Sequence, residues 1–197
     1  MEQRQQKQRR PIDKEKVAKA VKDLLVAIGE NPDREGLKDT PRRVSNFYAE
    51  ALCGESQRPE DVLSIYYEEE QYDEIVLLKN IPFYSLCEHH LLPFYGKIHI
   101  AYIPHKKRLL GISKLARLVD MYSRRLQLQE RITKYLADTI MKLAKPLGVM
   151  VIAEAEHLCF SMRGVKKPGT TIVTSAVRGT FLKDAKTRAE ALSLIKK

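Results

Sequence analysis

The chain has 197 residues, 44% of them hydrophobic and 30% charged, and 35 Lys and Arg against 25 Asp and Glu give a formal net charge of +10. This composition is typical of a globular domain that folds without disulfides, and no apolar stretch approaches the ~20 residues that cross a bilayer, which excludes an integral membrane role. Residues 1–10 lack the apolar core of a secretory signal, and three cysteines argue against a disulfide framework, so the expected compartment is the cytoplasm.

The positive charge belongs to the second half of the chain. Residues 1–96 carry 14 basic and 18 acidic side chains, a net charge of −4, whereas residues 97–197 carry 21 basic and 7 acidic ones, a net charge of +14. Segment 55–74 is acidic and is expected to be a solvated, loop-rich connector. The basic half suits a nucleic acid, an anionic membrane surface, a polyphosphate small molecule or simply a solvated face, and charge alone does not choose among them.

The N-terminal third predicts a disordered basic arm over residues 1–11, followed by two helices. Asp13 caps the first helix and Gly29 follows its end, while Thr40 caps the second helix, with proline at its first position, and Gly54 ends it. The side chains expected to form their buried stripes are Val17, Val21, Leu24, Leu25 and Ile28 in the first helix and Val44, Phe47, Tyr48, Ala51 and Leu52 in the second.

From residue 75 onward the hydrophobic period changes to that of strands. Residues 75–78 and 96–103 read as strands, with His99 and His105 expected at the surface. Two helices follow, the first capped by Ser113 and the second running through Leu147, and then come strands over 149–155 and 171–177 and a terminal helix, carrying Ala189, that Asp184 opens. This order predicts an α+β fold, a largely antiparallel sheet with helices on one face, over a domain spanning 73–197 and preceded by a helical region with the acidic connector over 12–72.

Two short Cys/His segments carry the chemistry. In the first, Cys87 and His90 are three residues apart and would share one face of a helical turn, while His89 is rotated by about 100° and stays free. In the second, His157 and Cys159 are two residues apart, and a strand would direct both side chains to the same side. Thiolate and imidazole are ligands that zinc prefers.

The ligand count leaves three interpretations open. Cys87, His90 and Cys159 would make an open, catalytic zinc site with histidines to spare, in which zinc lowers the pKa of a bound water and favours hydrolysis. A structural site would need Cys53, His157 or another histidine as a fourth ligand. The third interpretation is buried or surface residues with no metal.

Basic residues near these segments suit an anionic ligand. Lys114 and Arg117 lie one turn apart behind Ser113, at a helix start that favours phosphate, and Arg163 follows Cys159 closely. Solvated helix charges are the alternative. By itself, Glu130 reads as an exposed helix acid.

Taken together, residues 87–94, 111–117, 129–131 and 157–165 resemble the zinc-dependent GTP cyclohydrolase I family in order and spacing, within a match that runs from about residue 40 to residue 195. The resemblance implies conversion of GTP and water to 7,8-dihydroneopterin triphosphate and formate, the first step toward tetrahydrofolate. It also implies the tunnelling fold and a homodecamer with active sites between subunits.

Residue by residue, the resemblance implies that Cys87, His90 and Cys159 hold zinc, whose hydroxide attacks C8 of the guanine. His157 would be the general acid and base, His89 would assist protonation of the purine, and Ser113 would contact the sugar. The implied substrate contacts are Glu130 and Gln129 on the guanine edge and Lys114, Arg117 and Arg163 on the triphosphate, with Arg43 as an addition. The resemblance implies no nucleic-acid or membrane partner.

Two rival hypotheses remain at this point. One is a basic nucleic-acid-binding module with a structural zinc, which predicts four protein ligands and no turnover. The other is a different tunnelling-fold enzyme acting on a purine or pterin, which the two-part Cys/His motif disfavours.

Overall fold

The centre of the molecule is a five-stranded sheet, seen in a computed structural model that describes residues 11–63, 66–67 and 72–196. The strand order is β5-β2-β3-β6-β7, and every neighbouring pair is antiparallel except β2 with β5, which are parallel. The strands are β2 (Val76–Cys87), β3 (Pro93–Ile103), β5 (Leu126–Gln127), β6 (Gly148–His157) and β7 (Ile172–Gly179). Apart from Pro11, the arm predicted over residues 1–11 lies outside the described residues.

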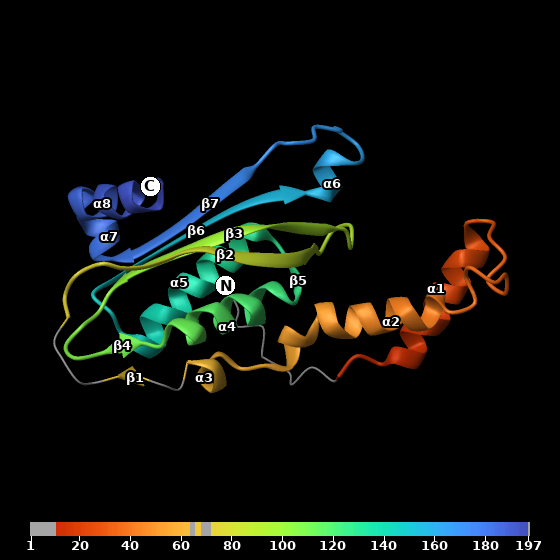
Figure 1. Ribbon diagram of the computed structural model, residues 1–197, viewed down its shortest axis with the longest axis horizontal. Coiled ribbons are helices and arrows are strands. Elements are labelled where there is room, and N and C mark those ends of the chain that lie inside the picture. The colour runs from red at the N-terminus through yellow and green to blue at the C-terminus, as the bar shows by residue number, and fades with distance from the viewer. Residues whose placement is uncertain (1–10, 64–65, 68–71, 197) are drawn as a thin grey trace, which may run out of the picture.

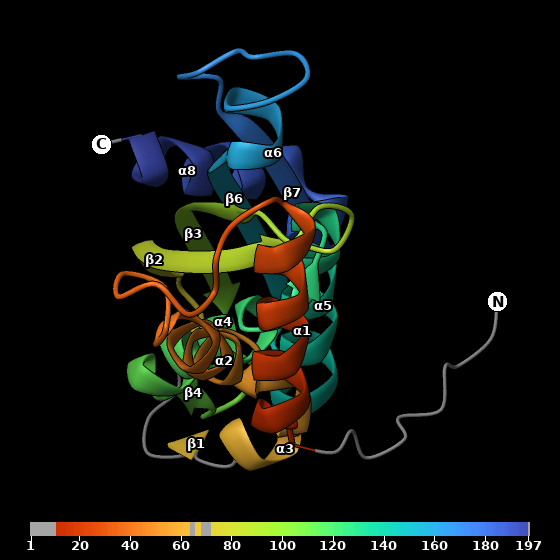
Figure 2. The ribbon, with the colours of Figure 1, turned by 90° about the vertical axis from the view of Figure 1, so that its right-hand side faces the viewer.

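Two long helices cover one face of this sheet, as Figures 1 and 2 show. They are α4 (Ile112–Ser123) and α5 (Gln129–Ala144), and both lie between β3 and β6 in the chain. Alternate residues of β3 and β6, such as Ile98 and Val151, are fully buried against helix residues such as Leu118 and Leu136. The predicted order strand, strand, helix, helix, strand, strand and the predicted α+β class are confirmed.

The opposite face of the sheet is covered at one end by the C-terminal helices α7 (Thr180–Lys183) and α8 (Ala185–Lys196). Phe181 and Ala191 pack there on the intervening residues of β3 and β6, including Ala101 and Met150. Asp184 accepts hydrogen bonds from backbone N–H groups at the start of α8, as predicted. Ala189 is exposed, however, because the buried side of α8 carries Ala191.

The N-terminal helices form a hairpin that projects from one end of the body, as Figure 1 shows. α1 (Lys14–Ala27) begins after its predicted cap Asp13, and α2 (Thr40–Ala51) begins one residue earlier than expected, because Asp39 rather than Thr40 precedes its first turn. The predicted buried stripes are wrong in part: the helices contact each other but leave exposed Leu24, Ile28 and Phe47.

The acidic connector is more ordered than predicted where the structure describes it. It contains a 3₁₀ helix, η1 (Cys53–Ser56), the short helix α3 (Pro59–Val62) and strand β1 (Tyr66–Tyr67), which pairs with β4 (Leu109–Leu110). Gly54 lies inside η1 rather than ending α2. A Cβ atom there would overlap the carbonyl oxygen of Met121, so the glycine permits the close approach of η1 to α4.

Three further expectations differ from the structure for local reasons. His99 is buried, at 3% exposure, and at an irregularity in β2 the backbone N–H of Asn80 donates to its Nδ1 atom at 3.3 Å, which satisfies one ring nitrogen inside the protein. Ser113 is not the cap of α4, which begins after Gly111. Leu147 lies beyond α5, because Lys145 adopts a left-handed conformation before a proline and ends the helix at Ala144.

None of the helices in the described part of the chain is both long and apolar enough to cross a membrane.

Gly96 lies where the backbone of β6 leaves no space for a side chain on β3, and it supports a stability prediction. A Cβ atom at this position would overlap the carbonyl oxygen of Glu154 and approach the Cα atom of Ala155, and both belong to the backbone of β6, which cannot move aside as a flexible side chain can. We expect Gly96→Ala to lower the free energy of unfolding by at least about 1–3 kcal/mol. Thermal unfolding measures the effect. Gly36→Ala is the control, because its Cβ would meet only the flexible end of Arg34; equal midpoints for the two variants would contradict the prediction.

Candidate metal centre and its surroundings

The first half of the site is the tight turn that follows β2. The backbone N–H of Leu91 donates to the carbonyl of Cys87 at 2.8 Å, and the N–H of Cys87 donates to the carbonyl of Leu92 at 2.9 Å. Leu91 closes the turn with a left-handed φ of 56°. This turn brings His90 back toward Cys87, and Cys87 Sγ lies 3.6 Å from His90 Nδ1.

The second half of the site is the junction between β6 and the short helix α6 (Leu158–Ser161). β6 ends at His157, so Cys159 lies in the first turn of a helix, and the predicted strand alternation of these two residues is wrong. Pairing of β3 with β6 places this junction beside the turn after β2. The donor atoms of Cys87, His90 and Cys159 all lie within 4.8 Å of one another.

The donor group fits a zinc ion. With zinc–sulfur bonds of about 2.3 Å and zinc–nitrogen bonds of about 2.0 Å, two tetrahedral ligands stand roughly 3.5 Å apart, close to the separation of Cys87 and His90. Burial and the neighbouring Cys87 thiol raise the pKa of the Cys159 thiol. A bound cation would favour both thiolates, because it neutralises the charge that burial and proximity make unfavourable. Three protein donors leave a fourth tetrahedral position for water or substrate.

His157 lies beside the donor group and is held on two sides. Its ring stacks on the buried ring of Phe94, with centroids 4.4 Å apart and an angle of 8° between the planes. Its Nε2 atom lies 2.8 Å from Oε1 of Gln129, the first residue of α5. Burial lowers the pKa of His157, while the nearby carboxylate of Glu130 acts in the opposite direction.

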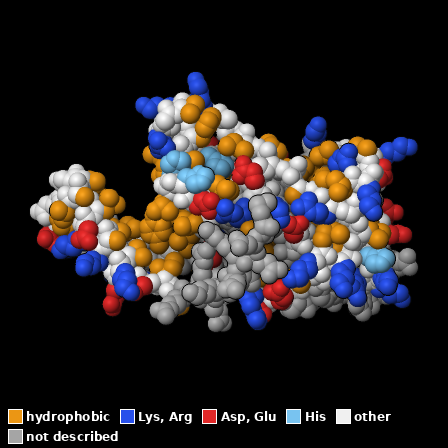
Figure 3. All heavy atoms as spheres, turned by 180° about the vertical axis from the view of Figure 1, so that it is seen from behind, with side chains coloured by type: hydrophobic (Ala, Val, Ile, Leu, Met, Phe, Trp, Pro, Cys, Tyr) orange, Lys and Arg blue, Asp and Glu red, His pale blue; other side chains and the backbone are white. Residues whose placement is uncertain are grey.

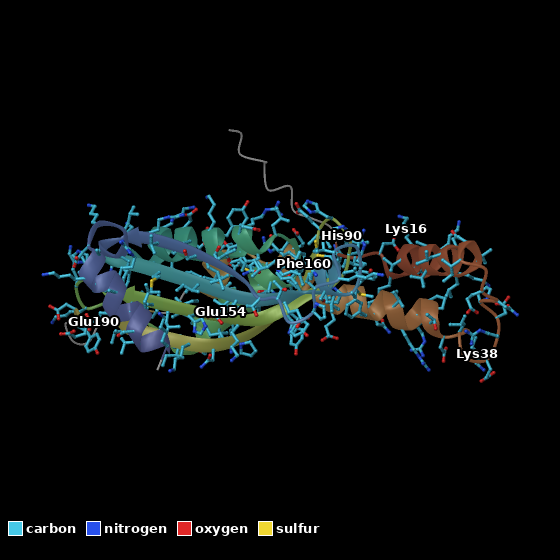
Figure 4. The ribbon with its side chains drawn as sticks, turned by 90° about the horizontal axis from the view of Figure 1, so that it is seen from above. Lys16, Lys38, His90, Glu154, Phe160 and Glu190 are labelled. Atoms are coloured by element: carbon cyan, nitrogen blue, oxygen red, sulfur yellow. The ribbon has the colours of Figure 1, made fainter. Side chains whose placement is uncertain are left out.

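The other residues predicted for this end differ in exposure. His89 has a side chain that is 63% exposed, and its ring meets that of His90 edge to face. Glu130 is exposed at the start of α5, and Arg163 is exposed just after α6, close enough to Cys159 to affect its pKa. Figure 3 shows histidine side chains grouped at the surface, and Figure 4 places His90 and Phe160 at the end of the body nearest the hairpin.

A half-buried ion pair that the sequence analysis did not predict braces the turn. The guanidinium of Arg131 on α5 donates two hydrogen bonds to the carboxylate of Glu88, at 2.5 and 2.9 Å. Glu88 is the residue between Cys87 and the two histidines. A bidentate pair of this kind fixes the turn against α5 and so helps to orient the donors.

The remaining predicted residues lie elsewhere. The first turns of α4 carry Ser113, Lys114 and Arg117. The opposite end of α4 leads into β5, and β5 pairs with β2 at Cys87. The helix is about 18 Å long at 1.5 Å per residue. Lys114 and Arg117 line a pocket of about 380 Å³ with Arg124, a cation that the sequence analysis missed, and no donor residue of the metal site lines it. Within the one described chain, the predicted phosphate contacts on α4 are therefore separate from the metal centre.

Arg43, on α2, is exposed beside Asp39.

A ββααββ sheet with helices on one face, a Cys-His-Cys donor group that could hold a metal ion and a histidine beside it are together consistent with an enzyme of the tunnelling-fold class. The family model described as GTP cyclohydrolase I matches residues 17–196, and the chain belongs to the GTP cyclohydrolase I family.

Named relatives agree with this assignment over almost the whole chain. GTP cyclohydrolase 1 of Clostridioides difficile is 59% identical over 184 residues, which cover 93% of this chain and 97% of the relative. GTP cyclohydrolase 1 of Listeria monocytogenes is 57% identical over 188 residues, covering 94% and 97%. The apo crystal structure of an archaeosine synthase QueF-Like protein is 22% identical with a TM-score of 0.45, covering 55% of this chain and 97% of that one, a likeness too weak to add to the fold assignment. The nucleic-acid-binding alternative is not favoured.

Proposed function

We propose that this protein converts GTP and water to 7,8-dihydroneopterin triphosphate and formate, as the first step toward tetrahydrofolate. The observation that carries the proposal is the three-donor group of Cys87, His90 and Cys159 with His157 beside it, in a chain whose named relatives are GTP cyclohydrolases. Thiolate ligands and a nucleotide substrate also favour the cytoplasm as the compartment.

We assign Cys87, His90 and Cys159 as the ligands of a zinc ion. When bound, zinc supplies Lewis acidity and activates water for attack at neutral pH. The stacked and hydrogen-bonded His157 would act as general acid and base at C8 of the guanine, because a neutral imidazole beside the donors can accept a proton from the attacking water and return it to the opening ring. His89, exposed at the same end, would protonate the purine as the ring opens.

Substrate contacts follow from charge and exposure. The exposed carboxylate of Glu130 near His157 suits the donor edge of guanine, and Arg163 suits a phosphate because its guanidinium can bind two oxygens at once. Lys114 and Arg117, in the pocket behind α4, would bind the rest of the triphosphate, and Ser113 at the start of that helix would contact the sugar.

The separation of these two sets of residues supports an oligomer with shared active sites. We propose that the metal end of one subunit meets the start of α4 of a second subunit, in an assembly that the family resemblance makes a decamer. The exposed apolar side chains of the N-terminal hairpin are available for such contacts.

The first test is direct. Zinc-loaded protein is incubated with GTP, and formate and the fluorescent pterin obtained after oxidation are measured, with Cys87→Ser as the control. Both products together support the proposal. Tightly bound zinc with neither product would contradict it and favour a structural metal.

If active sites are shared between subunits, two inactive variants should restore activity when they assemble together. Cys159→Ser damages only the metal end and Lys114→Ala only the α4 end, so each variant alone is expected to be inactive. After co-expression in equal amounts, about a quarter of the interfaces would join two intact ends if assembly is random, and turnover should return to about that fraction. Metal content and subunit ratio are measured on the same sample. No recovery from a mixed assembly would show that each site lies within one subunit.

A further inference from the structure

Gln129 is a buried amide whose hydrogen-bonding groups are all directed at protein atoms. Gln129 is the first residue of α5 and is 1% exposed. Its Nε2 atom lies 2.9 Å from the carbonyl oxygen of Ala153 on β6 and 2.9 Å from that of Ile172 on β7. Its Oε1 atom lies 2.8 Å from Nε2 of His157.

These partners determine which way the amide faces. The two carbonyl oxygens can only accept, so they must face the NH₂ group, and both of its hydrogens are used. The amide oxygen must then face the imidazole. Because that oxygen can only accept, Nε2 of His157 must carry the proton in this contact. In the neutral ring, Nδ1 is therefore the nitrogen with a free lone pair.

The ring that Gln129 contacts is also fixed in its plane. Phe94 is fully buried and stacks on it with an angle of 8° between the planes. Phe94 and His157 are register partners of β3 and β6, so the stack is part of the sheet. One ring face and the Nε2 edge are thus occupied by protein, which leaves the Nδ1 edge to act on a ligand.

We infer that Gln129 is a positioning residue that fixes the tautomer and orientation of His157, and that it does not contact the guanine. The inference rests on the proposed function, because it takes His157 to be the group that moves a proton. It differs from the role on the guanine edge that the family resemblance implies for Gln129, since neither hydrogen of its amide is available to a ligand.

Gln129→Met tests the role, because methionine has a similar length but cannot donate to the two carbonyls and offers His157 only a weakly accepting sulfur. We expect the zinc content and KM for GTP to stay close to wild type and kcat to fall by about 10- to 100-fold, the size of loss typical of partners that orient a metal-ligating histidine. In a His157→Ala background the same change should cause no further loss. Thr133→Val is the matched control: Thr133 is also buried on α5, and among the described residues its hydroxyl bonds to backbone carbonyls of its own helix alone, so its removal should leave kcat unchanged.

Two results with Gln129→Met would overturn the inference. A raised KM with little change in kcat would show that Gln129 binds GTP, and an equal loss of kcat with and without His157 would show a general structural role. A measurement on the wild type covers the case in which Gln129→Met does not fold: histidine-specific ¹⁵N NMR of the zinc-loaded protein, with His157 assigned by its absence from His157→Ala. We expect a protonated Nε2, and a protonated Nδ1 would refute the inference. Absence of formate release by the wild type would instead refute the proposed function, while the NMR result would still decide the tautomer.

Discussion

Cys159→Ser is expected to reduce the zinc content from about one ion per chain to nearly none and to abolish formation of formate from GTP. The site offers three protein donors, and a serine hydroxyl does not replace a thiolate as a zinc ligand near neutral pH. With two ligands left, the ion would be held mainly by water. Elemental analysis of the purified protein after dialysis and a formate assay on the same sample measure the two effects.

The control for this experiment is the third cysteine. Cys53 lies in η1, outside the donor group, and Cys53→Ser should retain zinc. Zinc bound at the wild-type level by Cys159→Ser would mean that a different set of residues holds the ion, and the proposed site would have to be abandoned.

His157→Ala is expected to separate metal binding from turnover. The imidazole lies beside the donor group but is not one of the three donors, so the zinc content should stay at the wild-type level. Loss of a general acid and base lowers the rate by about 10²- to 10⁴-fold, and we expect formate release to fall by that factor. Parallel zinc analysis shows whether the loss is catalytic.

A second histidine provides the comparison. His105 is exposed in the turn after β3, and His105→Ala should leave both zinc content and turnover unchanged. If His157→Ala turned over GTP as fast as His105→Ala does, His157 would have no part in the reaction.

The sequence predicted the fold where one local pattern decides the structure. Alternation in residues 96–103 correctly assigned Ile98 and Ile100 to the core, and Asp13 and Asp184 correctly marked the starts of helices. It failed where a distant part of the chain intervenes. His99 is polar and flanked by alternating residues, yet it is buried, and its Nδ1 atom accepts a hydrogen bond from Asn80 at an irregularity of β2, a different strand. Phe47 has helical spacing, but a projecting hairpin has no core to bury it.

The site shows the same division. The spacing of Cys87 and His90 was enough to predict that they lie together, since both belong to one turn. No local pattern shows that Cys159 lies beside them, because it is the pairing of β2 and β6 with β3 that places it there. The contacts of Gln129 and Arg131 could not be read from the sequence either. Each depends on which residues of another element face the first turns of α5, and that is decided by how the helix packs on the sheet.

The location of the donors has a consequence for the folded chain as a whole. Cys87 ends the second strand of the chain and Cys159 follows the sixth, so an ion held by both is a removable crosslink that closes a loop of roughly seventy residues. An ion that binds only the folded state adds to its stability in proportion to the logarithm of its free concentration. If zinc binds there as proposed, resistance of this chain to heat and to proteases depends in part on the zinc supply around it, and a chelator would first weaken the end of the molecule that carries the three donors.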